Sequence, residues 1–138
     1  MGKTVSEVMT SNPCTIDADK PVSYAAKMMR DEDVGIAPIV EGKRLVGTVT
    51  DRDIAIRVVA EGKDPNATIV RDIASTKLVT IDPHQDLDEA LRLMAQHQVR
   101  RLPVVEEDGR LVGVVAQADV AREAGERQTG QLVEDISK

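Results

Sequence analysis

The chain has 138 residues, 41% of them hydrophobic, which is enough for one compact body or two small subdomains. Its single cysteine excludes an internal disulfide framework, and its formal net charge of −6 argues against non-specific nucleic-acid binding. No signal pattern or long apolar run is evident, so we expect a soluble cytoplasmic protein without a membrane span.

The sequence contains one structural unit twice. Thr15-Ile16-Asp17 recurs as Thr80-Ile81-Asp82, and Leu45-Val46-Gly47 recurs as Leu111-Val112-Gly113. Such a repeat predicts two similar units packed with pseudo-two-fold symmetry. We place the first repeat at residues 5–65, the second at 66–126, and a C-terminal tail with a short helix (129–137) at 127–138.

The elements of the first repeat follow from its hydrophobic pattern. A hydrophobic opening at 5–9 precedes a short extended piece at 14–16, and apolar residues at helical spacing predict a helix around 22–29. Short runs at 37–40 and 44–49 predict two strands joined by a tight turn, and a second helix is expected over 51–61.

The second repeat has the same order of elements. The opening lies at 70–74 and an extended piece at 78–81; Asp86 or Asp88 then starts a helix that reaches about residue 94. Asp108-Gly109 is a hairpin signal between strands at 102–105 and 110–115, and a final helix covers 117–126. Each repeat is therefore β-α-β-β-α, which predicts an α/β (α+β) fold with a core of Val, Ile, Leu, Ala and Met.

The repeated unit, with Pro-Ile/Val-Val followed by Leu-Val-Gly-x-Val-x-x-x-Asp, resembles the CBS domain pair, or Bateman module. The likeness covers residues 5–126, and the small size resembles stand-alone tandem CBS proteins. It implies a non-enzymatic regulatory module that binds an adenosine-containing ligand (AMP, ADP, ATP or S-adenosylmethionine) in the cleft between two CBS units. It also implies a homodimer, a separate and unidentified partner protein, and no cofactor other than the regulatory nucleotide.

Three residues match the family's ribose-phosphate pattern. Gly47, without a Cβ, would let a ligand approach the strand closely. Thr50 lies where this strand meets the next helix, so its hydroxyl and the free N–H groups of the helix could face a phosphate. Asp53 could accept hydrogen bonds from the two ribose hydroxyls. The resemblance places an adenine slot near Thr15, Ile16, Ala37, Pro38 and Ile39.

Thr50 and Asp53 have a second interpretation. Thr-x-x-Asp before a helix approximates a capping box, which stabilises the helix whether or not a ligand binds. The two roles are compatible.

The second repeat departs from the ligand pattern. Gly113 and Asp119 remain, but Ala116 replaces Thr50 and can neither cap a helix nor donate to a phosphate. Arg100 and Arg101 stand where the first repeat has Gly35 and Ile36. The resemblance implies that these two arginines lie near the ligand phosphates. Alternatively, they are a solvated pair where a strand begins. Arg52 and Arg57 are weaker phosphate candidates. We therefore expect two unequal clefts, with the better site at Thr50 and Asp53.

Other chemistry is sparse. His84 and His97 have no partners at metal-ligand spacing, so no metal site is expected, and Cys14 is expected to be a half-buried free thiol. No arrangement of nucleophile and base indicates an enzyme. Two rival functions remain: a protein-interaction dimer with degenerate clefts, and a nucleic-acid-binding regulator, against which the acidic charge and the scarcity of aromatic residues count.

Overall fold

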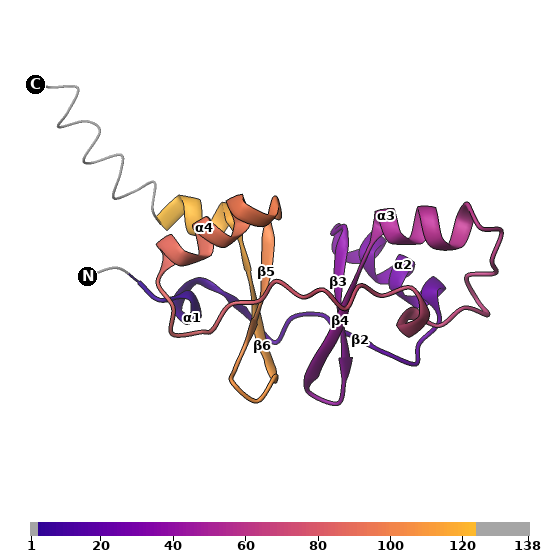
Figure 1. Cartoon of the computed structure of the whole chain (residues 1–138), viewed down its shortest axis with the longest axis horizontal. Helices are drawn as coiled ribbons and strands as arrows, with labels where there is room; N and C mark the ends of the chain where they lie inside the picture. The colour runs from indigo at the N-terminus through magenta and orange to yellow at the C-terminus, as the bar shows by residue number, and fades with distance from the viewer. Residues whose placement is uncertain (1–2, 124–138) are drawn as a thin grey trace, which may run out of the picture. The chain divides into compact units, whose positions relative to one another are not determined.

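The computed structural model describes residues 3–123. They form two compact units, which we name by their hairpins. The first-hairpin unit comprises residues 14–78 and 108–111, and the second-hairpin unit comprises residues 3–13, 79–107 and 112–123. Each contains a three-stranded sheet and helices (Figure 1), which confirms the mixed α+β class. The helix expected at 129–137 lies outside the described residues.

The sheet of the first-hairpin unit has the order β2-β3-β4. Strand β2 (Ile16–Asp17) is parallel to β3 (Ile36–Glu41), which pairs antiparallel with β4 (Arg44–Thr50). The tight turn between β3 and β4 contains Gly42 with a φ of 63°, a left-handed conformation that glycine adopts without steric cost. The predicted hairpin is thus present.

Two helical segments accompany this hairpin on one side (Figure 1). Helix α2 (Val22–Glu32) ends at Asp33, whose backbone is left-handed. Helix α3 (Asp51–Ile54) continues as the π-helix η1 (Ala55–Val59), in which the Ala60 N–H donates to the Ala55 carbonyl. The helix expected over 51–61 is therefore present, but it is wider than a regular α-helix after its first turn.

The core of this unit contains no aromatic residue, as predicted, and the unit's one tyrosine, Tyr24, is 47% exposed. It is made where α2 and η1 face the sheet, and it includes residues from the opening of the second repeat. Its fully buried members are Ile16, Ala18, Val22, Ala25, Ala37, Ile39, Val49, Val58 and Val70.

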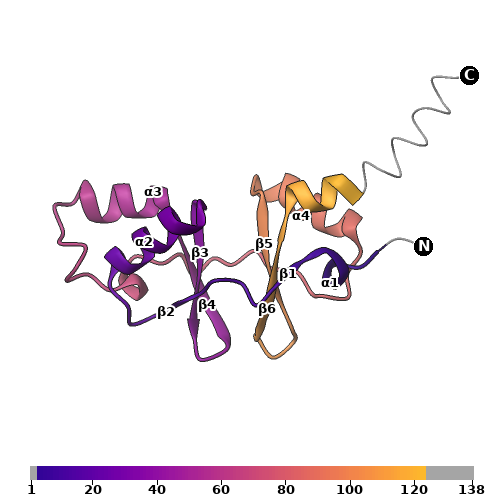
Figure 2. The same ribbon diagram turned by 180° about the vertical axis from the view of Figure 1, so that it is seen from behind.

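The second-hairpin unit has a sheet of order β1-β6-β5, with β5 (Arg101–Val105) and β6 (Leu111–Ala116) forming the hairpin. Strand β1 (Thr10–Ser11) pairs antiparallel with β6 (Figure 2). Helix α4 (Leu87–His97) begins after Asp86, whose side chain accepts a hydrogen bond from the Glu89 N–H at 2.8 Å. Asp86 is therefore the start signal. Of the extended piece expected at 78–81, Ile81 pairs with β5, through a parallel bridge to Val104.

The opening segments are exchanged between the repeats. Helix α1 (Val5–Val8) belongs to the first repeat, yet Val5 lies in the core of the second-hairpin unit with Ile81 and Leu87. Conversely, the 3₁₀-helix η2 (Val70–Asp72) of the second repeat places Val70 in the core of the first-hairpin unit. The compact units and the sequence repeats thus have different boundaries.

Candidate functional site

Thr50 and Asp53 form a reciprocal capping box in the first-hairpin unit. The Asp53 N–H donates to Thr50 Oγ1 at 3.0 Å, and the Thr50 N–H donates to Asp53 Oδ2 at 2.9 Å. Extended backbone at Thr50 ends β4 and lets its side chain turn back over the first turn of α3. The stabilising interpretation of this pair is therefore confirmed.

The capping box leaves chemical capacity on both side chains. The Thr50 hydroxyl oxygen accepts a hydrogen bond in the capping box. Its hydrogen is given to no acceptor described within residues 3–123, so it can be donated to a ligand. Asp53 uses Oδ2 for the cap, so Oδ1 is the oxygen that could accept from a ligand. The Asp53 side chain is 18% exposed, which shields it partly from water but does not seal it off.

The N–H groups of this helix start are already engaged, contrary to expectation. The Asp51 N–H donates to the Gly35 carbonyl at 2.9 Å, and the Arg52 N–H donates to Asp51 Oδ1 at 2.8 Å. The Asp53 N–H is held by Thr50. No free N–H of residues 51–53 is left for a phosphate, and the Asp51 carboxylate adds negative charge there. This end of α3 is suited to hydroxyl groups rather than to an anion.

Gly47 is explained by packing within the chain. A Cβ built at this position would lie 3.0 Å from the Ser75 carbonyl oxygen and 3.1 Å from the Ala74 Cβ. The backbone of Ser75 also exchanges two hydrogen bonds with Thr48, at 2.8 and 3.0 Å. The space on that side of the strand is therefore occupied by the opening segment of the second repeat, not left open for a ligand.

Asp53 has a second partner residue, Arg57, that the ligand pattern does not include. Arg57 Nε lies 3.9 Å from Asp53 Oδ1, and Arg57 Nη1 donates to the Ile73 carbonyl at 3.1 Å. The ion pair connects two residues one helical turn apart, and the hydrogen bond connects the helix to the segment beside Gly47. The Asp-x-x-x-Arg spacing was the sequence signal for the ion pair, whereas the link to Ile73 depends on the exchanged opening segment.

The residues expected to line an adenine slot divide into two groups. Ile16, Ala37 and Ile39 have no exposed surface and belong to the hydrophobic core, so their side chains are covered by the unit itself. Thr15 is exposed beside β2, and Pro38 is buried between Ala37 and Ile39 along β3, where side chains alternate between the two faces of the sheet. Only Thr15 among these five side chains is exposed to solvent.

The corresponding helix start in the second-hairpin unit has different chemistry. Ala116 ends β6 and has no side-chain oxygen, so no capping box is possible. The Asp119 carboxylate instead accepts from Arg122. Gly113 is again occupied by the chain, because a Cβ there would lie 2.9 Å from the Thr10 carbonyl oxygen. The expected inequality of the two repeats is therefore a structural fact, although its effect on ligand binding stays a prediction.

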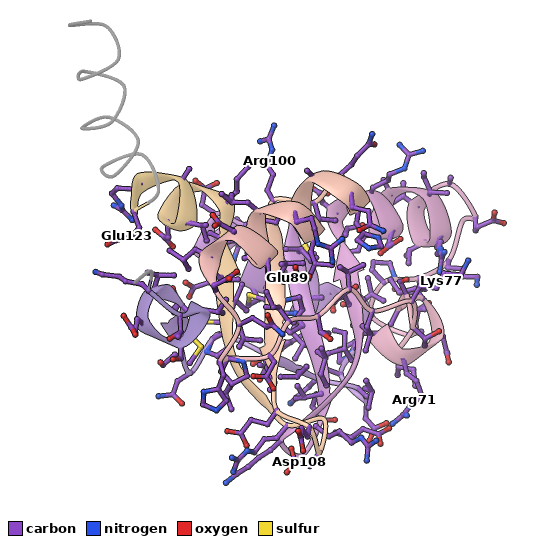
Figure 3. The ribbon with its side chains drawn as sticks, turned by 60° about the vertical axis from the view of Figure 1, so that its left-hand side comes forward. Arg71, Lys77, Glu89, Arg100, Asp108 and Glu123 are labelled. Atoms are coloured by element: carbon purple, nitrogen blue, oxygen red, sulfur yellow. The ribbon has the colours of Figure 1, made fainter. Side chains whose placement is uncertain are left out.

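The basic pair lies where β5 begins. Arg100 is exposed and its side chain points outward (Figure 3), while Arg101 is half-buried. The Arg100 carbonyl accepts from the Gln117 N–H at 2.7 Å, as Gly35 does from Asp51 in the other unit. Backbone contacts at this point are thus alike, and the difference is confined to the side chains.

Within residues 3–123, no group of three or more His, Cys, Asp and Glu side chains could hold a metal ion.

The Cys14 side chain is exposed rather than half-buried. Partial desolvation is the main cause that raises the pKa of the Cys14 thiol, and the charge and hydrogen bond of the Glu32 carboxylate raise it further.

No helix in the described part of the chain is both long and apolar enough to cross a membrane.

Comparison with known proteins identifies both repeats. The CBS domain family model matches residues 5–60 and 70–126. The CBS domain-containing protein YhcV of Bacillus subtilis is 40% identical over 135 residues, covering 97% of this chain and 95% of that protein.

Solved structures share the fold. The crystal structure of Hypoxic Response Protein I with two coordinated zinc ions has a TM-score of 0.80 and 38% identity, covering 87% of this chain and 98% of that one. The crystal structure of CBSX2 in complex with AMP has a TM-score of 0.79 and 26% identity, covering 92% and 99%. With both repeats matched and near-complete mutual coverage, the chain belongs to the CBS domain family as a tandem CBS protein.

Proposed function

We propose that this protein is a regulatory module that senses an adenosine-containing nucleotide, with Thr50 and Asp53 recognising its ribose. The observation that carries the proposal is the capping box, which fixes both side chains while leaving the Thr50 hydroxyl hydrogen and Asp53 Oδ1 for a ligand. A structural neighbour solved with AMP supports the choice of ligand. AMP, ADP, ATP and S-adenosylmethionine share the same ribose.

The local charges favour the ribose over the phosphate as the recognised group at this site. A carboxylate oxygen that accepts from vicinal hydroxyls forms charge-assisted hydrogen bonds, which are stronger than neutral ones. The N–H groups of residues 51–53 are already used, and Asp51 is acidic. A phosphate would therefore need cationic side chains, of which the exposed Arg52 is the nearest in sequence.

Isothermal titration with AMP, ADP, ATP and S-adenosylmethionine tests the proposal. Asp53→Asn keeps an oxygen for the Thr50 N–H but removes the charge, so it should weaken binding about tenfold or more. Asp119→Asn is the matched control in the other repeat and should have a smaller effect. Wild-type protein that binds none of the four below millimolar concentration would exclude adenosine sensing, and the reverse order of the two variants would exclude the inequality of the sites.

A protein-interaction role receives independent support from exposed apolar side chains. Val59 is 69% exposed and Ile56 is 45% exposed on η1, and Tyr24 on α2 is 47% exposed. We propose that the Ile56–Val59 surface contributes to a homodimer, and that a separate partner protein reads the liganded state. Burial of such side chains would contribute about 25 cal/mol per Å² of apolar surface. The cytoplasmic location expected from the sequence stays a prediction.

A further inference from the structure

We propose that Arg57 is a positioning residue that holds the Asp53 carboxylate for ribose recognition, and that the second repeat lacks this device. The inference deepens the proposed function and rests on it. It assigns to Arg57 a role distinct from the direct phosphate contact expected of a basic residue near a nucleotide.

Arg57 connects two elements rather than facing solvent alone. Its Nε lies 3.9 Å from Asp53 Oδ1, while its Nη1 donates to the Ile73 carbonyl at 3.1 Å. Ile73 is only 1% exposed and lies in the core of the unit, so this hydrogen bond joins Arg57 to a packed segment. A guanidinium group presents several donors in one rigid plane, which suits it to two partners in different directions. The Arg57 side chain, 52% exposed, therefore has two partners inside the unit, Asp53 and Ile73.

These contacts close a ring around the capping box. Thr50 holds Asp53, Asp53 faces Arg57, and Arg57 holds Ile73. Two residues further on, Ser75 pairs with Thr48 of β4 through two backbone hydrogen bonds. Strand β4 then leads back to Thr50. Oδ2 of Asp53 is thus hydrogen-bonded from the strand, and Oδ1 faces the Arg57 guanidinium at ion-pair distance, which favours one orientation of the carboxylate.

Arg57 also lies within the π-helical segment Ala55–Val59. π-Helical turns are rare and occur frequently at functional sites, because the wider turn changes the direction of the side chains that follow. Here the irregular turn coincides with the residue that reaches from Asp53 to Ile73. This independent feature of the backbone is consistent with a positioning role.

The second repeat carries the opposite charge at the equivalent position. Counting from the shared aspartate, Asp53 and Arg57 correspond to Asp119 and Glu123. Glu123, labelled in Figure 3, pairs through Oε2 with Lys3 Nζ at 3.2 Å. Asp119 pairs with Arg122, not with the residue at position 123. Glu123 cannot make the contact that Arg57 makes, and Arg122, whose side chain is 67% exposed, has no described bond that ties Asp119 to an opening segment. Ribose selectivity should therefore belong to the site at Asp53.

Ligand pairs that differ by one group distinguish positioning from other roles. We would titrate wild type and Arg57→Ala with AMP, 2′-deoxy-AMP and adenosine. Arg52→Ala is the matched control for the ribose preference, because it removes the same charge from the same helix at a residue without a described contact to Asp53. As a phosphate candidate, Arg52 can affect the AMP-to-adenosine ratio but should leave the preference for AMP over 2′-deoxy-AMP unchanged. The preference of wild type for AMP over 2′-deoxy-AMP should be about tenfold, the size of one hydrogen bond to a charged group. Arg57→Ala should reduce this preference to near one and leave the AMP-to-adenosine ratio unchanged.

Three results would overturn the inference. A fall in the AMP-to-adenosine ratio in Arg57→Ala would make Arg57 a phosphate contact. Weaker binding of all three ligands with both ratios preserved would make it merely structural. Loss of the ribose preference in Arg52→Ala as well would make the effect one of net charge.

A ligand-independent measurement separates this inference from the proposed function. Amide hydrogen exchange at Thr50 and Asp53 should be about tenfold faster in Arg57→Ala than in Arg52→Ala, because the capping box loses one of its supports. If exchange is faster in Arg57→Ala but the wild-type protein binds no adenosine compound, Arg57 positions Asp53 and the proposed sensing function is excluded. Unchanged exchange would overturn the positioning itself.

Discussion

The carbonyl oxygen of Ser75 lies 3.0 Å from the point where a side chain at Gly47 would begin. Ser75 belongs to the second repeat and Gly47 to the first, so this contact exists only because the opening segments are exchanged. The glycine that sequence reasoning assigned to a ligand is therefore also required by the fold.

Gly47→Ala should destabilise the protein by about 1–3 kcal/mol, the usual effect of forcing an atom into a packed interior. The neighbouring atom is backbone, held by two hydrogen bonds to Thr48, so it cannot move aside cheaply. Urea unfolding monitored by circular dichroism measures the change.

Gly35→Ala is the control for this effect. A Cβ at Gly35 would also lie 3.0 Å from another atom, but that atom is the terminal Oδ2 of the exposed Asp51 side chain, which can move at the cost of one exposed hydrogen bond to the Arg52 N–H. Equal losses for the two variants would show that tight packing against Ser75 is not what requires glycine at position 47.

The second repeat has Ala116 at the position of Thr50 and therefore lacks the capping box. Ala116→Thr should stabilise the protein by about 1 kcal/mol, because a hydroxyl at this position can accept from the Asp119 N–H as Thr50 does from Asp53. Ala116→Val adds similar bulk without the hydroxyl and should show no such gain. Urea unfolding of both variants is the measurement, and an equal gain for valine would mean that burial, not capping, is responsible.

Only some of these features could be predicted from the sequence. The hairpins, the Asp86 cap and the Thr50–Asp53 pair depend on local patterns, and local patterns are visible in one sequence. The exchange of opening segments, the packing of Ser75 on Gly47 and the Arg57–Ile73 bond join residues far apart in the chain. Because Val70 is apolar in either arrangement, the sequence contains no signal for which sheet it covers.

Adenine recognition illustrates the same limit. Ile16, Ala37 and Ile39 were expected near a ligand, yet an apolar residue on a strand is equally suited to a core, and these three are fully buried there. Asp51, by contrast, is not among the three residues of the ribose-phosphate pattern, yet its carboxylate places negative charge at the helix start and its N–H is engaged with the Gly35 carbonyl.

The exposed surface of η1 predicts the assembly state. Val59→Asp should shift the protein towards a monomer in analytical ultracentrifugation, because a charge at a 69% exposed apolar residue disfavours burial in an interface but costs little in the folded chain. Thr76→Asp places the same charge at an exposed loop residue and should leave the assembly unchanged. An identical sedimentation profile for wild type and Val59→Asp would exclude this surface from the dimer.

The Cys14 thiol provides a prediction on pH. Partial desolvation and the nearby Glu32 carboxylate both disfavour the thiolate, so the pKa of Cys14 is raised and the thiol is protonated at neutral pH. Because the thiolate is the reactive form, alkylation by iodoacetamide should be slow near pH 7 although the residue is exposed, and should accelerate only in the alkaline range. Glu32→Gln removes the negative charge, so the midpoint of the rate profile should move to lower pH. Glu61→Gln removes the same charge elsewhere and should leave the midpoint in place. A midpoint that does not respond to Glu32→Gln would mean that desolvation alone raises the pKa.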